Sequence, residues 1–441
     1  MDTGMIRILL AAIVVCAGGA FAATTGLLHS FEKVQATDQF WAEGADIGDF
    51  NRDGKMDVVS GAYWYEGPDF KQRHELYPAH ASFKHKKADG VEETIPGFEG
   101  ALGVKNAYSD CFLTFTYDFN GDGWTDVMVY GFPGKEVPWY ENPKNKQGHW
   151  QRHVVFDVLD NESPGFADIT GDGKPEILCC SGGYIGYAAA DWQDPAAPWK
   201  FHPVSPKGNY QRFTHGIGSG DINGDGRIDI VEKDGWWEQP ASVANDPVWT
   251  KHTFSFAPAA AQMPVYDING DGLNDVLTCI NAHGYGISWY EQVREDGKIT
   301  FREHVILKKD ASKNRYGVQF SQPHAFALVD MDKDGLTDFV TGKRFWAHGK
   351  DGPDPESNAA AVLYWFRLTR PAKGQAEFIP HLIDDDSGVG TQVTVGYVSN
   401  RKYPDVVVGN KKGVFVFEHR VKQVTRAEWE KAQPKPQAES R

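Results

Sequence analysis

Six short acidic segments carry oxygen-bearing side chains at one repeated spacing. In the segment 221–229 these side chains stand at positions 1, 3, 5 and 9, and Gly226 stands at position 6. Alternate residues of such a loop turn their oxygens toward one centre, the backbone carbonyl at position 7 adds another, and glycine permits the sharp turn. Because hard cations prefer oxygen ligands, we expect each segment to hold a structural Ca²⁺, up to six in all. The expected ligands are Asp49, Asn51, Asp53 and Asp57; Asp118, Asn120, Asp122 and Asp126; Asp168, Thr170, Asp172 and Glu176; Asp221, Asn223, Asp225 and Asp229; Asp267, Asn269, Asp271 and Asp275; and Asp330, Asp332, Asp334 and Asp338.

The acidic segments should differ in their affinity for Ca²⁺. The segment 168–176 has Thr170 at position 3, one charge fewer than an aspartate would give, and Glu176 at position 9, so weaker binding is expected there. A seventh, eroded copy at 397–405 keeps only its last aspartate and should be empty. The strongest binding is expected in the segments that begin at Asp49, Asp118, Asp221, Asp267 and Asp330.

The stretches around each segment predict four short strands per repeat. A short strand-like run precedes the segment, a β-branched run follows it, and an aromatic run such as WYE at 289–291 comes next. The fourth run often carries a histidine. Four-stranded units that recur at intervals of about 46 to 69 residues, seven in all, are typical of a β-propeller. We therefore predict an all-β, seven-bladed β-propeller with calcium-binding loops. The seventh unit lacks a fourth run, so the segment 30–34 would complete it and close the ring by pairing N- and C-terminal strands.

The same geometry predicts a second set of residues at the central channel. If the first strand of a blade runs into the calcium loop, its start lies on the opposite face, about six residues earlier. Counting back six residues from each loop gives Glu43, Phe112, Glu162, His215, Ala261, His324 and Thr391. The loops between second and third strands turn on this face as well. Two long insertions, 77–108 and 342–361, should build walls around a cleft there.

Histidine, carboxylate and cationic side chains around one channel suit acid–base chemistry on a sugar. A base would take a proton next to a carbonyl or carboxyl group. A cation, or a further divalent metal held by histidine and glutamate, would stabilise the resulting enolate. The candidate catalytic residues are His215, His324, Glu43, Glu162, His283, Lys343, Arg344 and His348. By contrast, six fourth-strand histidines recur at equivalent places and are expected to pack the blades: His74, His153, His202, His252, His304 and His381.

The repeats resemble the FG-GAP/VCBS family, in which calcium loops join the first two strands of each propeller blade. Four further segments resemble the propeller domain of aldos-2-ulose dehydratases: FTHGIGSGD at 213–221, DGWWEQP at 234–240, GKRFWAHG at 342–349 and GVGTQ at 388–392. This resemblance implies a β-elimination on 1,5-anhydrofructose or a related keto-sugar, with His215 as a candidate base and a divalent metal as Lewis acid. Those enzymes carry cupin domains after the propeller, and this chain ends soon after the seventh blade, so a second step assigned to the cupins should be absent.

Composition and the chain ends narrow the class of protein. The 441 residues carry a net charge of −15 without a basic cluster, which argues against nucleic-acid binding. Residues 1–23 have the pattern of a secretory signal peptide, so we expect a secreted or periplasmic protein with no membrane span in the mature chain. Residues 27–420 would form the propeller and 421–441 a short polar tail, with a capping box at 425–428 that favours a helix. The four cysteines after the signal are expected to be mainly buried thiols.

Two functions fit these observations. The first is a dehydratase or lyase that performs β-elimination on a keto-sugar or a uronide. The second is a propeller without catalytic activity that binds a glycan or a protein. For the lyase and for a glycan-binding propeller, the expected ligand is a carbohydrate or a sugar-derived small molecule. A catalytic site predicts a pocket with a histidine within about 3 Å of a carboxylate or metal, whereas a recognition surface predicts a broad, flat, aromatic face.

Overall fold

The computed structural model describes residues 25–79, 82–87, 89–96, 108–399 and 401–437. The predicted signal peptide lies outside these residues. The chain divides into two compact units. The larger unit contains Ser30–Arg420 and Pro434–Arg441, and the smaller contains Met1–His29 and Val421–Gln433. In the part of the chain that the structure describes, no helix is long and apolar enough to span a membrane.

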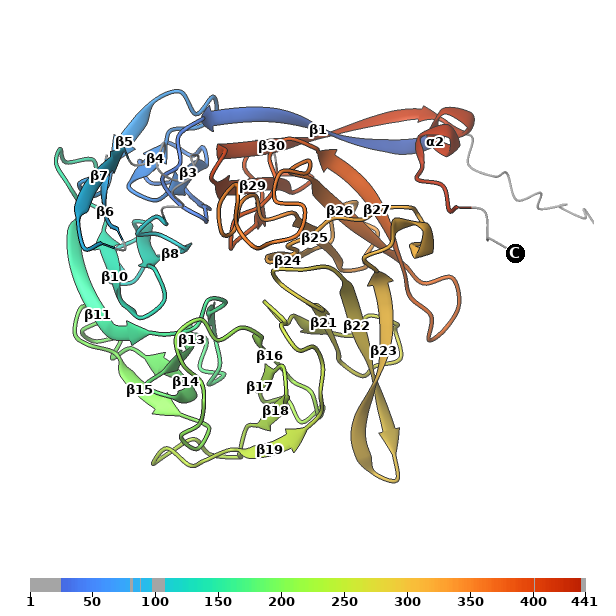
Figure 1. The fold of residues 1–441 in the computed structure, drawn as a ribbon, viewed down its shortest axis with the longest axis horizontal. Coiled ribbons are helices and arrows are strands. Elements are labelled where there is room, and N and C mark those ends of the chain that lie inside the picture. Colours follow the sequence, from blue (N-terminus) through green and yellow to red (C-terminus); the bar gives the residue numbers. More distant parts are fainter. Residues whose placement is uncertain (1–24, 80–81, 88, 97–107, 400, 438–441) are drawn as a thin grey trace, which may run out of the picture. The chain divides into compact units, whose positions relative to one another are not determined.

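Seven four-stranded sheets follow one another around a centre, which confirms the predicted seven-bladed β-propeller (Figure 1). In six blades the strands lie in sequence order, so each strand is paired with the one that follows it. The blades are β2(Asp46–Gly48), β3(Asp57–Ser60), β4(Tyr63–Tyr65), β5(Arg73–Glu75); β8(Leu113–Tyr117), β9(Asp126–Tyr130), β10(Lys135–Glu141), β11(Gln151–Leu159); β12(Gly165–Ala167), β13(Glu176–Ser181), β14(Tyr184–Ala189), β15(Lys200–Pro203); β16(Ile217–Gly220), β17(Asp229–Glu232), β18(Gly235–Glu238), β19(Thr250–Thr253); β20(Val265–Tyr266), β21(Asp275–Cys279), β22(Ile287–Glu295), β23(Lys298–Leu307); and β24(Phe326–Val329), β25(Asp338–Gly342), β26(Leu363–Thr369), β27(Glu377–Asp384).

The seventh sheet has the order β1-β30-β29-β28, so its outermost strand comes from the N-terminal side of the chain. Its strands are β1(Thr25–Thr37), β28(Thr394–Gly396), β29(Asp405–Asn410) and β30(Gly413–Thr425). A separate hairpin pairs β6(Ser82–Lys86) with β7(Glu92–Pro96). The helices are short: the 3₁₀ turn η1(Ala311–Lys313) and α2(Arg426–Ala432), whose N-terminus carries the capping box between Thr425 and Glu428.

Apolar layers between neighbouring sheets form the core. One layer joins Met128 and Trp139 of the second blade to Ile177 and Cys179 of the third. The second strand of each blade is covered on both faces, which explains why it is a continuous β-branched run and not an alternating one. All of β29 is buried, for example. Cys111, Cys179, Cys180 and Cys279 are free thiols within these buried layers.

The fourth-strand histidines pack the blades, as predicted. His252 stacks on Trp236 with ring centroids 4.1 Å apart, and its Nε2 lies 2.7 Å from Glu238 of the third strand. The same aromatic stack recurs at His74, His153, His202, His304 and His381. These imidazoles cover the aromatic third strands at the outer edge of the blades, away from the channel.

In every copy except the segment 168–176, the acidic residue at position 9 connects three segments of its blade. Asp229 is buried, and its carboxylate accepts hydrogen bonds from the backbone N–H groups of Ile222 in the loop and Gln239 after the third strand, at 2.9 Å each. Asp405 of the eroded seventh copy makes the same contacts, to Val398 and His419. This residue therefore has a structural role that does not depend on a cation.

Candidate functional site

The residues six positions before each loop meet at the channel. The backbone N–H of Thr391 donates to the carbonyl of Glu43 at 2.7 Å, and its hydroxyl donates to the carbonyl of Phe112. The first strands begin one to four residues after these positions, so the residues lie just before regular pairing starts. We call this side of the propeller, where first strands begin and the loops between second and third strands turn, the channel face.

Four of the predicted residues form a compact group that we call the channel cluster: Glu162, His215, His283 and His324. Each offers one ligand atom, and the four atoms lie within 4.8 Å of one another. The Nε2 atoms of His215 and His324 are 3.3 Å apart, and they lie 3.3 and 3.5 Å from the carboxylate of Glu162. Two imidazole nitrogens thus face one carboxylate from two other blades.

The orientation of the His215 ring is fixed by an atom outside the cluster. His215 Nδ1 lies 2.8 Å from the carbonyl of Phe213, so this nitrogen carries the proton and Nε2 presents a lone pair to the cluster. Phe213 has a positive φ of 66°, and Gln322, which also stands two residues before a cluster histidine, has a φ of 61°. Such backbone strain in residues that are not glycine is found most often at functional sites.

Burial and charge set the protonation of the cluster. Burial lowers the pKa of His215, and it lowers that of His324 to about 3, helped by the nearby Arg344 guanidinium. Burial alone would raise the pKa of Glu162, but the Arg344 guanidinium holds it well below its usual value. Neutral imidazoles of His215 and His324 therefore lie beside an ionised Glu162, which is the state in which these groups bind divalent metals.

Arg344 joins two predicted acids from blades that are not adjacent. Its Nε donates to Glu43 at 3.0 Å and its Nη1 to Glu162 at 2.6 Å, with all three side chains buried. Lys411 lies 3.8 Å from the other oxygen of Glu43. Because Arg344 is only 1 % exposed, we assign it to holding Glu162 in place and not to direct contact with substrate.

The exposed edge of the cluster is formed by two histidines that share one carboxylate. Asp354 lies 2.9 Å from Nδ1 of His348 and 3.6 Å from Nδ1 of His283, and the two rings are 4.6 Å apart. Burial opposes ionisation of Asp354, but hydrogen bonds with the two histidines hold its pKa well below its usual value. The side chain of His348 is 41 % exposed, so it is open to solvent.

Lys343 was also predicted as a catalytic residue, but its ammonium group makes a contact outside the channel cluster. It is buried and donates to Ser321 Oγ at 2.7 Å, and burial lowers its pKa to about 8. The other seven predicted residues lie in the channel cluster or are linked to it through Arg344 and Asp354.

A pocket opens beside the cluster. It has a volume of about 510 Å³, and its lining includes Phe213, Thr214, His215 and Lys233. We call it the His215 pocket. A ligand in this pocket would have direct access to the imidazole of His215.

Two residues of the site were missed by sequence reasoning. Asp354 lies in the insertion 342–361, which was expected on this face, but nothing in the sequence selects one acid of that insertion. Lys411 lies in the turn between β29 and β30, which is the seventh-blade equivalent of loops that did yield candidates. The loop between the second and third strands of the seventh blade, treated like the same loops of the other blades, would have yielded Lys411 as a candidate.

Two of the six acidic loops gather three acidic side chains closely enough to hold a cation, and the calcium sites stay a prediction. Acidic oxygens of Asp168, Asp172 and Glu176 lie within 4.8 Å of one another, as do those of Asp330, Asp332 and Asp338. In the sixth loop Arg367 also binds Asp332 and Asp334, at 2.5 and 2.9 Å. This guanidinium would compete with a cation, which the sequence did not indicate.

Comparison with known proteins supports the repeats. A family model described as FG-GAP-like repeat matches residues 118–179 and 267–341. The chain contains FG-GAP-like repeats. No curated protein matches the sequence.

Several solved structures are similar in fold. The V. cholerae biofilm matrix protein Bap1 is 10 % identical, with 91 % of this chain and 89 % of that chain covered and a TM-score of 0.39. The exotype rhamnogalacturonan lyase YesX is 13 % identical (89 % and 72 % covered, TM-score 0.39), and the rhamnogalacturonan lyase YesW is 15 % identical (89 % and 72 %, TM-score 0.37). At these values the likenesses carry no argument about function. The resemblance to aldos-2-ulose dehydratase stays a prediction.

Proposed function

We propose that the protein is a carbohydrate lyase that performs β-elimination on a keto-sugar or a uronide at the channel cluster. The observation that carries the proposal is the convergence of Glu162, His215, His283 and His324, whose ligand atoms lie within 4.8 Å of one another beside a pocket. The calcium loops, on the opposite face, would stabilise the blades that bring these residues together.

The donor set fits a divalent transition metal. Three imidazoles and one carboxylate are ligands that such metals share, and His215 has the hydrogen bond outside the cluster that usually orients a metal-binding histidine. The carboxylate of Asp354 faces Nδ1 of His283 at a longer distance, 3.6 Å. A bound divalent cation would act as a Lewis acid on the carbonyl or carboxylate oxygen of the sugar.

The proton acceptor that we propose is His348. Its Nδ1 faces Asp354, which fixes the ring and stabilises the imidazolium, in the way that a carboxylate supports a catalytic histidine. The imidazole would take the proton from the carbon next to the carbonyl. The C–H electrons then form the carbon–carbon double bond, the β C–O bond breaks, and the leaving oxygen departs as water or an alcohol after taking a proton from solvent. No oxidant or reductant is required.

The test uses 1,5-anhydrofructose and a panel of oxidised glycosides, with ultraviolet absorbance of the enone or unsaturated uronide as the readout. We expect the wild type to form product. His348→Gln should lower turnover by about 10² to 10⁴ while it keeps its metal content, because only the proton acceptor is lost. His283→Ala should lose both metal and activity.

The control variant is His252→Gln, because this histidine stacks on Trp236 at the outer edge of a blade. It should keep both metal content and turnover. If the metal-loaded wild type forms no product from any substrate of the panel, the lyase proposal is wrong. A ligand that binds without turnover would then favour the alternative, a propeller that binds a glycan without catalysis.

A further inference from the structure

A second pocket on the channel face has the composition of a sugar-binding subsite. It has a volume of about 510 Å³ and lies between the first and second blades, with walls from β9, β10 and the first residues of the insertion 77–108. Two pairs of aromatic rings line it, Tyr77 with Tyr140 and Tyr108 with Phe132. We call it the aromatic pocket.

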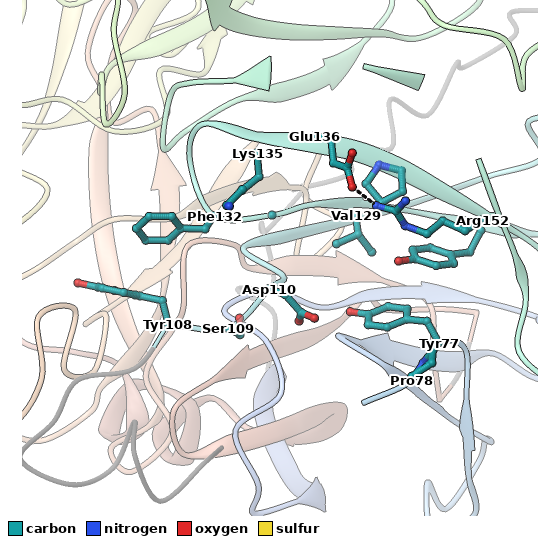
Figure 2. Close-up of a pocket in the computed structure, with 13 residues that line it drawn as sticks. Tyr77, Pro78, Tyr108, Ser109, Asp110, Val129, Phe132, Lys135, Glu136 and Arg152 are labelled. Carbon is teal, nitrogen blue, oxygen red and sulfur yellow. Dashed lines mark hydrogen bonds and ion pairs between the residues drawn. The ribbon is translucent and has the colours of Figure 1, made fainter. Parts of the chain in front are cut away.

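The rings of this pocket leave space between them. The rings of Tyr77 and Tyr140 are stacked, with centroids 4.7 Å apart, and those of Tyr108 and Phe132 are 5.4 Å apart. Figure 2 shows Tyr108 and Phe132 on one side and Tyr77 on the other, with Asp110 between them. Aromatic faces of this kind bind the apolar C–H face of a pyranose, while polar groups at the rim bind its hydroxyls.

The polar groups of the pocket are balanced in charge. Asp110 and Glu136 are acidic, Lys135 and Arg152 are basic, and Arg152 is paired with Glu136. The hydroxyl of Tyr77 is buried without a hydrogen-bond partner, although buried hydroxyls are normally paired. A neutral ligand with several hydroxyl groups would satisfy this pocket better than an anion would.

The aromatic pocket adjoins the His215 pocket. Phe132 lines the first and Phe213 the second, and their rings contact each other with centroids 5.5 Å apart. Arg212 lies over both rings, at 5.5 and 5.7 Å from their centroids. The linings of the two pockets therefore meet at these three side chains, so one chain of sugar units could occupy both.

We propose that the aromatic pocket binds a neutral pyranose unit of an oligosaccharide whose neighbouring unit occupies the His215 pocket. This deepens the proposed function, since it makes the substrate a chain of at least two sugar units and not a free monosaccharide. Binding of the sugar in the aromatic pocket does not require catalysis, so it can be tested in the absence of turnover.

The test is saturation-transfer NMR with maltose and cellobiose as neutral probes and digalacturonate as the charged probe. It uses the His348→Gln background, in which elimination would not consume the probe. We expect a neutral disaccharide to bind. Tyr108→Ala should weaken binding about tenfold or more. Lys135→Ala, which changes an exposed residue of the same pocket, should have an effect of the same size. Tyr397→Ala, an exposed tyrosine on the calcium-loop side of the seventh blade, is the matched control and should bind normally.

Binding that is unchanged in both Tyr108→Ala and Lys135→Ala overturns the proposal, and so does the failure of every neutral probe to bind. Stronger binding of digalacturonate than of the neutral probes contradicts the charge argument and overturns the neutral assignment. A failed lyase assay with intact disaccharide binding leaves the pocket assignment standing. Turnover of a monosaccharide without disaccharide binding would instead retain the lyase and reject the pocket.

Discussion

At the scale of single residues, the site depends on one buried guanidinium. Arg344 holds Glu43 and Glu162 together from different blades, and its Nη2 has no hydrogen-bond partner in the described structure. Removal of one member of a buried ionic group leaves the other charges uncompensated, which is far more costly than loss of an exposed ion pair.

Arg344→Met should therefore destabilise the protein by about 3 to 5 kcal/mol, as measured by denaturant unfolding. Arg420 provides the comparison, since it pairs with Glu32 on the exposed surface at 3.0 Å. Arg420→Met should cost about 1 kcal/mol or less. Equal losses for the two variants would show that Arg344 does not organise the site.

The carboxyl group of Asp46 makes the free energy of unfolding depend on pH. It accepts hydrogen bonds from the N–H and the hydroxyl of Thr116, at 2.8 and 3.0 Å, and burial raises its pKa from 3.8 to about 7. Because the folded state binds this proton more tightly than the unfolded state, its contribution to stability is complete below about pH 4. The contribution is lost as the pH rises through 7.

Asp46→Asn removes this titration and keeps an oxygen for Thr116. The difference in unfolding free energy between the variant and the wild type should shift in favour of the variant by roughly 1 to 3 kcal/mol as the pH rises from 4 to 8. The measurement is denaturant unfolding of both proteins at the two pH values. A difference that does not change with pH would mean that Asp46 titrates normally.

Sequence reasoning at this scale found most of the site. A count of six residues back from each loop reached Glu43, Glu162, His215 and His324, because every blade brings its first strand to the channel in the same way. Asp354 was beyond this method, since its place depends on how the insertion 342–361 folds and not on the repeat. The burial of Arg344 was also not predictable, because it results from contacts between blades.

At the scale of elements, each repeat combines a cation loop with a carboxylate that ties the blade together. The loop aspartates and the position-9 acid belong to one motif, yet Asp405 keeps its backbone contacts in a copy that has lost the other ligand positions. The two roles can therefore be separated by experiment.

Asp225→Ala, in the fourth loop, should lower the melting temperature more in calcium than in EDTA, because without the cation this carboxylate keeps only its contacts with Asn223 and Arg227 in the exposed loop. Asp405→Ala should lower it by a similar amount in both buffers, since the lost bonds are to backbone N–H groups. Thermal melts of the two variants and the wild type in each buffer provide the measurement. The wild type itself should melt at a markedly lower temperature in EDTA, and an unchanged melt would argue that calcium is peripheral.

The strands themselves could be predicted from their apolar patterns, but their lengths could not. The first strand of the fifth blade, β20, is only Val265–Tyr266, because regular pairing starts well after the channel residue Ala261. The fifth and sixth blades have long outer hairpins, in which β22 pairs with β23 over nine residue pairs. Apolar and polar residues are mixed in those outer strands, as in KITFREHVIL of β23, so their length was not evident from hydrophobic periodicity.

At the scale of the larger unit, the repeated blades place the acidic loops and the channel cluster on opposite faces. The acidic loops connect first and second strands on one face, and the histidines, Glu162 and the two pockets lie on the other. The cluster is assembled from residues 162, 215, 283 and 324, far apart in sequence, so its formation reports correct packing of several blades at once.

The measurement that tests this account most directly is anomalous diffraction from crystals of the protein grown with Zn²⁺ or Mn²⁺. We expect an anomalous peak between Glu162 and the Nε2 atoms of His215 and His324, about 2.0 to 2.2 Å from the ligand atoms. His283→Ala should weaken or remove this peak. Peaks confined to the acidic loops, with none at the channel cluster, would contradict the proposed metal centre.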